Sequence, residues 1–232
     1  MTDDRGGART LADLAFAELR AAIIEGALPP GSPVRLQEQV DRLSMSSVPI
    51  REALRFLERS GLVDRTPHRG AQVAEMSARD LNETYTIRLE LETMAVRAAA
   101  THMTEQDRNR LLELMDRYAG ASRSGDPAAR AIHGDFHMAL YRLSDSKWLL
   151  RLLPMLWDNS ERYRRLALPL RGTTEQRIQE HRAIVDACFA GDPDAAEEAL
   201  RSHLSNTFEV AIERLQQEED EASVAETEPL SE

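Results

Sequence analysis

The chain has 232 residues, 42% of them hydrophobic, and a formal net charge of −11 at pH 7. This length suits one large domain or two of ordinary size, with enough apolar residues for a core. The acidic balance argues against binding of nucleic acid by bulk charge. No apolar run approaches about 18 residues and the N-terminus is polar, so we expect a cytoplasmic protein with neither a membrane span nor a signal peptide.

The N-terminal region begins with a polar segment, residues 1–9, that we expect to be disordered. Apolar residues at helical spacing predict a helix over residues 11–25 and a shorter one over 36–43. Ser46 or Ser47 can cap a third helix, and Pro49 falls in its first turn, where a missing N–H costs little. One face of this third helix is apolar and is predicted to be buried: Ile50, Ala53, Leu54 and Leu57.

The opposite face of the third helix carries Ser47, Arg51 and Arg55 at intervals of four residues, so two guanidinium groups project from one stripe. The alternative is that these arginines form only a solvated face. Gly61 ends the helix, and residues 62–63 and 71–73 predict two short strands joined by a turn that contains Arg69. This order of elements is that of a winged helix-turn-helix, so residues 10–75 are predicted to bind DNA.

Residues 11–75 resemble the GntR family of bacterial transcription regulators. The resemblance rests on the segment 24–31 and on a second string: Ser46, Pro49, Arg51, Glu52, Ala53, Leu54, Leu57, Gly61, Leu62, Gly70 and Val73. It implies binding to double-stranded operator DNA. Family members often carry Arg, Arg and Thr where this chain has Gln37, Ser47 and Val48. The predicted DNA-binding residues are Ser46, Ser47, Arg51, Arg55, Arg69 and Gln37.

The pattern after residue 76 is helical only. Start signals such as Ser77 with Asp80, Thr104 with Asp107, and Asp followed by Pro at 126 and 192 predict six helices. The expected ranges are 77–102, 104–122, 127–144, 146–169, 174–190 and 193–217. The chain is therefore predicted to be mostly α, a winged helix-turn-helix followed by an all-helical bundle over 77–217. Residues 218–232 contain seven acidic residues and are predicted to be a disordered tail.

Four of the six histidines fall in the bundle at positions that can converge. His133 and His137 are four residues apart, so both project from one helix face, the spacing that lets two imidazoles bind one metal ion. His181 and His203 lie on the apolar stripes of the last two helices. Each histidine alone could be a core residue satisfied by a carbonyl or a carboxylate. Four together, on three helices, favour a metal site.

Residues 77–215 resemble the FCD domain, the ligand-binding domain of the FadR subfamily. The matching residues are Tyr85, Arg88, Glu92, Ala98, Ala99, Ala100, Phe136, His137, Glu180, His181, Ala183, Ile184 and His203. Many such domains hold a divalent metal through one Asp and three His, which implies His137, His181 and His203 as ligands. His133 stands at the Asp position, and Asp135 lies about 200° from His137 around the helix. The site therefore has either four imidazole ligands, or three imidazole ligands with His133 in contact with the ligands and not with the metal.

A nitrogen-rich ligand set favours Zn(II), Ni(II) or Cu(II) over Mn(II), with zinc or nickel expected. The resemblance implies a small carboxylate effector bound at the metal and by Arg88, whose guanidinium could clamp a carboxylate in bidentate fashion. Glu92 is expected to be the structural partner of Arg88, and Asn159 to line the pocket.

The sequence thus predicts a homodimeric, metabolite-responsive transcription regulator rather than an enzyme. Binding of the effector would shift the two DNA-binding domains. Two alternatives remain open at this point. The metal could itself be the signal or a structural staple, or the histidines could activate water in a metal-dependent hydrolase.

Overall fold

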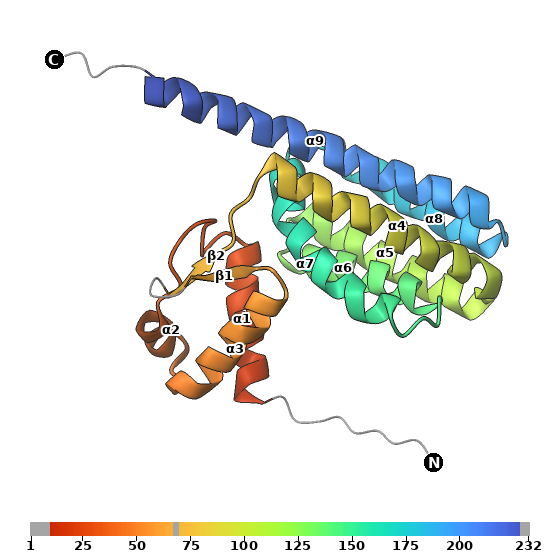
Figure 1. The fold of residues 1–232 in the computed structure, drawn as a ribbon. Helices are drawn as coiled ribbons and strands as arrows, with labels where there is room; N and C mark the ends of the chain where they lie inside the picture. Colours follow the sequence, from red (N-terminus) through yellow and green to blue (C-terminus); the bar gives the residue numbers. More distant parts are fainter. Residues whose placement is uncertain (1–9, 67–69, 228–232) are drawn as a thin grey trace. The chain divides into compact units, whose positions relative to one another are not determined.

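The computed structural model describes residues 10–66 and 70–227, and the chain divides into two compact units, Met1–Met76 and Ser77–Glu232 (Figure 1). Residues 1–9 and Arg69, for which we predicted disorder and a DNA contact, lie outside the described residues. None of the helices in the described part of the chain has the length and apolar character needed to cross a membrane.

The first unit contains α1 (Leu11–Ile24), α2 (Leu36–Leu43), α3 (Ser47–Arg59) and a two-stranded antiparallel sheet. Its strands are β1 (Val63–Thr66) and β2 (Gly70–Val73). Their register runs from Val63 opposite Val73 to Thr66 opposite Gly70. The first strand therefore begins at Val63 and continues beyond the predicted residues 62–63, because ladder pairing carries it through three polar residues. This arrangement confirms the predicted winged helix-turn-helix.

The apolar stripe of α3 is buried as predicted and packs against α1 and the sheet. Ile50, Ala53 and Leu57 are fully buried, and Pro49 and Leu54 nearly so. Ser46 occupies the N-cap position with an extended backbone, but its side chain makes no capping hydrogen bond. The helix is held in place by its apolar face, and its other face is left to solvent.

The second unit is a bundle of α4 (Ala78–His102), α5 (Glu105–Ser124), α6 (Ala128–Arg142), α7 (Leu149–Ala167), α8 (Thr174–Phe189) and α9 (Pro193–Thr227). Two of the predicted helix starts are reciprocal capping boxes in the structure, Thr104 with Asp107 and Thr173 with Gln176. Helix α9 packs along α4 and α8 (Figure 1). The core between the helices includes Phe136, Leu140 and Tyr141, all fully buried.

Helix α9 ends at Thr227 and not near residue 217, so the predicted disorder of 218–232 is wrong for residues 218–227. Residues 228–232 lie outside the described part. The acidic composition misled the prediction, because Glu, Ala and Gln are also good helix formers. An ion pair from Arg214 to Glu218, 2.9 Å long and one helical turn apart, supports the extension.

The start of α4 is tied to α7 by Tyr163, which is fully buried. Its hydroxyl donates to Asp80 Oδ2 at 2.6 Å and accepts from the backbone N–H of Ser77 at 3.3 Å. Ser77 is the N-cap of α4 and its side chain accepts from the Asp80 N–H. Ser77, the first residue of the second unit, is thereby hydrogen-bonded to α7.

Candidate functional site

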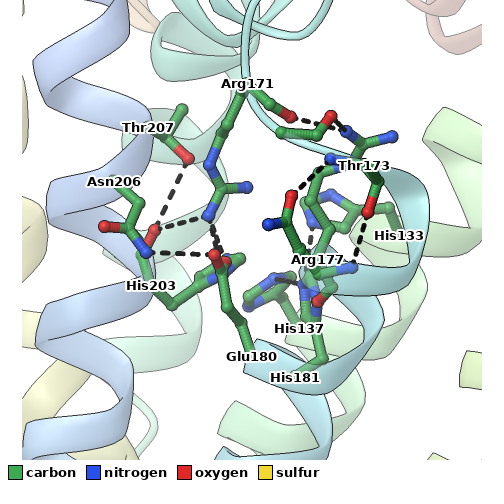
Figure 2. Close-up of polar contacts among 12 residues, drawn as sticks. His133, His137, Arg171, Thr173, Arg177, Glu180, His181, His203, Asn206 and Thr207 are labelled. Carbon is green, nitrogen blue, oxygen red and sulfur yellow. Dashed lines mark hydrogen bonds and ion pairs between the residues drawn. The ribbon is translucent and has the colours of Figure 1, made fainter.

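The structure brings the four predicted histidines together inside the bundle (Figure 2). Helix α6 supplies His133 and His137, α8 supplies His181 and α9 supplies His203, and all four are buried. One ring nitrogen from each lies within 4.8 Å of the others. His181 Nε2 is 3.1 Å from both His133 Nε2 and His137 Nε2.

The hydrogen bonds fix the tautomers of two of these rings. The His181 Nδ1–H donates to the Arg177 carbonyl at 2.5 Å. Tyr141 gives its only proton to Glu92, so its oxygen accepts from the His137 Nδ1–H at 3.0 Å. Burial, together with Glu92, raises the pKa of Tyr141 and keeps it a donor. Both Nε2 atoms therefore carry lone pairs that face each other at 3.1 Å, which is repulsive unless a cation lies between them.

His203 is oriented in the same way by a carboxylate. Its Nδ1 donates to Glu180 Oε2 at 2.8 Å, and Glu180 is held by Asn206 at 3.0 Å and by an ion pair with Arg171. Arg171 also donates to the His203 carbonyl at 3.1 Å (Figure 2). Carboxylates and carbonyls behind ligating imidazoles are the usual support of a metal site, because they fix the ring and raise its basicity.

His133 Nε2 lies as close to His181 Nε2 as His137 Nε2 does, but no hydrogen bond orients the His133 ring from behind. Its Nδ1 is buried without a hydrogen-bond partner among the described residues. The ring is held by packing instead, with Tyr118 and Trp157 ring centroids each 5.3 Å away. By distance His133 belongs to the donor set, and by its surroundings it is the least supported member.

The donor set fits a divalent metal. With Zn–N bonds of about 2.0–2.1 Å, a tetrahedron has N···N edges of about 3.3 Å and an octahedron edges of about 2.9 Å. The two 3.1 Å separations lie between these values. The set is thus compatible with a closed four-nitrogen site or with a larger coordination sphere that has open positions.

Burial keeps the imidazoles neutral, which is the state that binds metal. Desolvation, with the charge of nearby Arg164 adding to it, lowers the pKa of His133, His137 and His203 well below the usual range. Burial lowers the pKa of His181 to about 4, against a backbone hydrogen bond that raises it. None of these rings carries a proton that a metal ion would have to displace near pH 7.

We expect the metal-free protein to lose stability as the pH falls from 6.5 toward 4. The unfolded chain protonates its histidines at about 6.5, whereas His181 resists protonation until about 4, so acid favours the unfolded state in that window. By pH 5 this one residue should cost about 2 kcal/mol. Urea denaturation at pH 7 and 5 measures the loss. His181→Gln should reduce the pH dependence and His102→Gln, at an exposed position, should not; an equal effect of both would contradict the explanation.

Arg88 and Glu92 form the predicted pair, with Arg88 Nε donating to Glu92 Oε1 at 2.6 Å. The Arg88 guanidinium lies over the rings of Tyr85 and Trp157, 4.9 and 5.3 Å from their centroids. Through Glu92 and Tyr141 it is connected to His137. Sequence reasoning missed Tyr141, although its position one helical turn after His137 was a usable signal, and it missed Arg171 and Trp157, for which the sequence carried none.

Whether Asn159 lines the pocket stays a prediction. It follows Trp157 by two residues in α7, about 200° around the helix, so the two side chains project from different faces. Its amide donates to the carbonyl of Met155 at 3.0 Å. The predicted role of Asn159 in the pocket has no support in this arrangement.

The predicted reading face of α3 is exposed. Arg51 and Arg55 project to solvent, Ser46 is exposed and Ser47 half-buried. Val48, 63% exposed, adds an apolar group to the same end of the helix. Gln37 in α2 is exposed and its amide donates to Asp41 at 2.9 Å. This face offers two arginines, a hydroxyl and a methyl-bearing side chain, the groups that contact base edges and phosphates.

A winged helix-turn-helix joined to a helical bundle with a buried histidine cluster defines a DNA-binding transcription regulator. Residues 11–73 match the model of the bacterial regulatory proteins of the gntR family, and residues 83–206 match that of the FCD domain. The chain therefore belongs to the GntR family and carries an FCD domain.

Named relatives agree with this assignment. The HTH-type transcriptional regulator BphR of Paraburkholderia xenovorans is 30% identical over 87% of this chain and 85% of that protein. The probable D-xylose utilization operon transcriptional repressor of Paenarthrobacter nicotinovorans is 35% identical over 79% of this chain and 80% of that protein. The solved structure of Escherichia coli McbR/YncC, 25% identical, superposes with a TM-score of 0.78 over 89% of this chain and 99% of that one. These relatives are regulators and not enzymes, as predicted.

Proposed function

We propose that this regulator holds one divalent transition metal with His133, His137, His181 and His203, and that a small carboxylate effector bound at this centre alters operator binding. The observation that carries the proposal is the pair of buried Nε2 lone pairs facing each other at 3.1 Å. Four neutral nitrogen donors suit Zn(II) or Ni(II). When bound, the metal supplies a positive anchor for a carboxylate oxygen.

The residues around the cluster would position the effector and exclude water. Arg88 is 4% exposed and stacks on Trp157, whose ring also packs on His137 at 4.7 Å. Its Nε is committed to Glu92, which leaves its terminal nitrogens to face a carboxylate. Binding would then be read out through α7, which connects Trp157 to Tyr163 and the start of α4.

A metal sensor without an organic effector is the second candidate, because four nitrogen donors can close a tetrahedral site. In that case the metal is itself the signal, or it only stabilises the fold. The two candidates differ in whether a coordination position stays open.

The deciding experiment titrates small carboxylates into metal-loaded protein at constant metal and follows operator binding by fluorescence anisotropy. We expect an acid that changes operator affinity by a factor of about 5–150. The Co(II)-substituted protein should show a change in its visible spectrum with the same acid. A spectrum that no acid alters, with operator binding that follows metal alone, would support the metal sensor.

We also propose that the protein is a homodimer formed through α4 and α7. These helices pack together and leave large apolar side chains exposed at or beside them: Ile87, Met94, Trp148, Leu152 and Met155. A second copy would bury this patch, and a two-fold dimer presents two recognition helices to a pseudo-palindromic operator.

We expect sedimentation at micromolar concentration to show a dimer, and Met94→Glu combined with Leu152→Glu to give a folded monomer with at least about tenfold weaker operator binding. Leu170→Glu, which changes another exposed apolar residue of the second unit, is the control. A wild-type monomer that binds a single half-site specifically would contradict the proposal.

A further inference from the structure

The bundle contains a cavity of about 280 Å³ whose lining includes no histidine. It lies between the end of α5, the start of α6, the end of α7 and Arg177 of α8. Its lining includes Tyr118, which is buried and whose ring also lies 5.3 and 6.0 Å from the rings of His133 and His181. The cavity and the candidate metal centre therefore both contact this one aromatic ring.

The lining of this cavity is strongly cationic. It includes four arginines and two carboxylates, an excess of two positive charges: Arg130, Arg164, Arg165, Arg177, Asp126 and Glu161. The carboxylates are already engaged. Glu161 takes two hydrogen bonds from Arg164, at 2.5 and 2.9 Å, and Asp126 accepts the first N–H of α6 at 2.8 Å.

Two arginines here have binding capacity left. Arg177 is 9% exposed; its Nη1 donates to the Arg171 and Gly172 carbonyls and its Nη2 to Thr174 Oγ1, yet its buried Nε has no hydrogen-bond partner in the described part of the chain. Arg165, which also lines the cavity, is exposed and makes no ion pair with a described residue. A buried guanidinium with an unpaired N–H and an excess of positive charge is the chemistry of an oxyanion site.

We infer that this arginine-lined cavity is a binding site for a doubly charged anionic group of a small metabolite, distinct from the metal centre. A phosphomonoester and a dicarboxylate carry the same charge and the same acceptor oxygens, and either fits a cavity of this size. The proposal goes beyond the metal-bound carboxylate, since the cavity's residues are separate from those around the histidines.

The site is placed to influence the metal centre. Tyr118 lines the cavity, and its ring also lies 5.3 and 6.0 Å from the rings of His133 and His181. An anion in the cavity would attract a cation held by these imidazoles and so strengthen metal binding, and by linkage the metal would strengthen binding of the anion by the same factor. The two sites would then respond jointly to metal and metabolite.

The test is equilibrium dialysis of the full chain, metal-loaded and metal-free, against inorganic phosphate and against succinate, with acetate and glycerol as singly charged and neutral comparisons. We expect the dianion whose shape suits the cavity to bind both forms, about tenfold more tightly with metal. Phosphate binding would indicate a phosphorylated metabolite, and succinate binding a dicarboxylate.

Variants separate this site from the metal centre. Arg165→Gln and Ser122→Glu, which adds a carboxylate to the lining, should each weaken binding of the dianion at least about fivefold without changing metal content. Arg182→Gln, which removes an exposed arginine of α8 outside the cavity, should have no effect. Dianion binding that both cavity variants leave unchanged, or that disappears entirely with the metal, would overturn the inference and leave the metal centre standing. Binding of neither dianion would also overturn it.

Discussion

Replacing His137 or His181 by alanine is expected to reduce bound metal from about one ion per subunit to a negligible amount. Each replacement removes an Nε2 donor of the 3.1 Å pair and leaves the partner behind it, Tyr141 or the Arg177 carbonyl, without its imidazole. Metal content of dialysed protein by mass spectrometry measures the loss. His102→Ala, on the exposed end of α4, is the matched control and should retain the ion.

His133 is the residue whose replacement says most about the site. If it is a ligand, His133→Ala should lower metal affinity as much as His137→Ala does. His133→Asp should then retain metal but shift the preference away from the nitrogen-loving ions, because an imidazole becomes a hard oxygen. If His133 only supports the other ligands, the loss should be about 10–100-fold with little change in preference.

Negligible metal in wild-type protein, or metal that survives the joint replacement of His137 and His181, would contradict the proposed centre. Circular dichroism of each variant guards against a trivial loss through unfolding, since all four rings lie in the bundle core.

Arg51→Ala is expected to weaken operator binding by about 1–3 kcal/mol and to relax specificity at one base pair in each half-site. Arg51 lies on the exposed face of α3, whose opposite face is fixed to the core by Ile50 and Leu57, so the substitution removes a contact and leaves the helix in place. Anisotropy titrations with operator variants measure both effects, with Arg182→Ala on the bundle as control.

Arg69 should behave differently, as a wing residue that contacts phosphate or the minor groove. Arg69→Ala should weaken binding to all sequences alike and reduce the salt dependence by about one unit of slope. An Arg51→Ala protein with an unchanged footprint and affinity would show that α3 is not the reading helix.

The sequence predicted the parts of this fold that local chemistry determines. Capping residues at Ser77, Thr104 and Thr173 placed the helix starts to within a residue or two, because a cap acts on the turn beside it. The convergence of His133 and His137 followed from their spacing on one helix. The end of α9 did not follow, since acidic composition alone does not distinguish an extended helix from a disordered tail.

The residues that contact and orient the histidine rings could not be predicted from the sequence. Glu180 and Arg171 meet His203 from α8 and from the segment before it, and Trp157 reaches the rings from α7, so their roles depend on how distant helices pack. Which face of α7 turns inward is decided by Trp157 and Tyr163, and a mixed apolar and basic stretch does not reveal it.

The anchoring of Ser77 limits how far the DNA-binding unit can travel. Ala74 is still held by the first unit through its N–H to the Leu62 carbonyl, and Ser77 is held by Tyr163, which leaves Glu75 and Met76 as the connection. The three Cα–Cα steps from Ala74 to Ser77 span at most about 10–11 Å when extended. Half-sites one helical turn apart are separated by about 34–36 Å, several times this length. In the proposed dimer, a connection this short would make the place where the two bundles meet one determinant of the distance between the recognition helices.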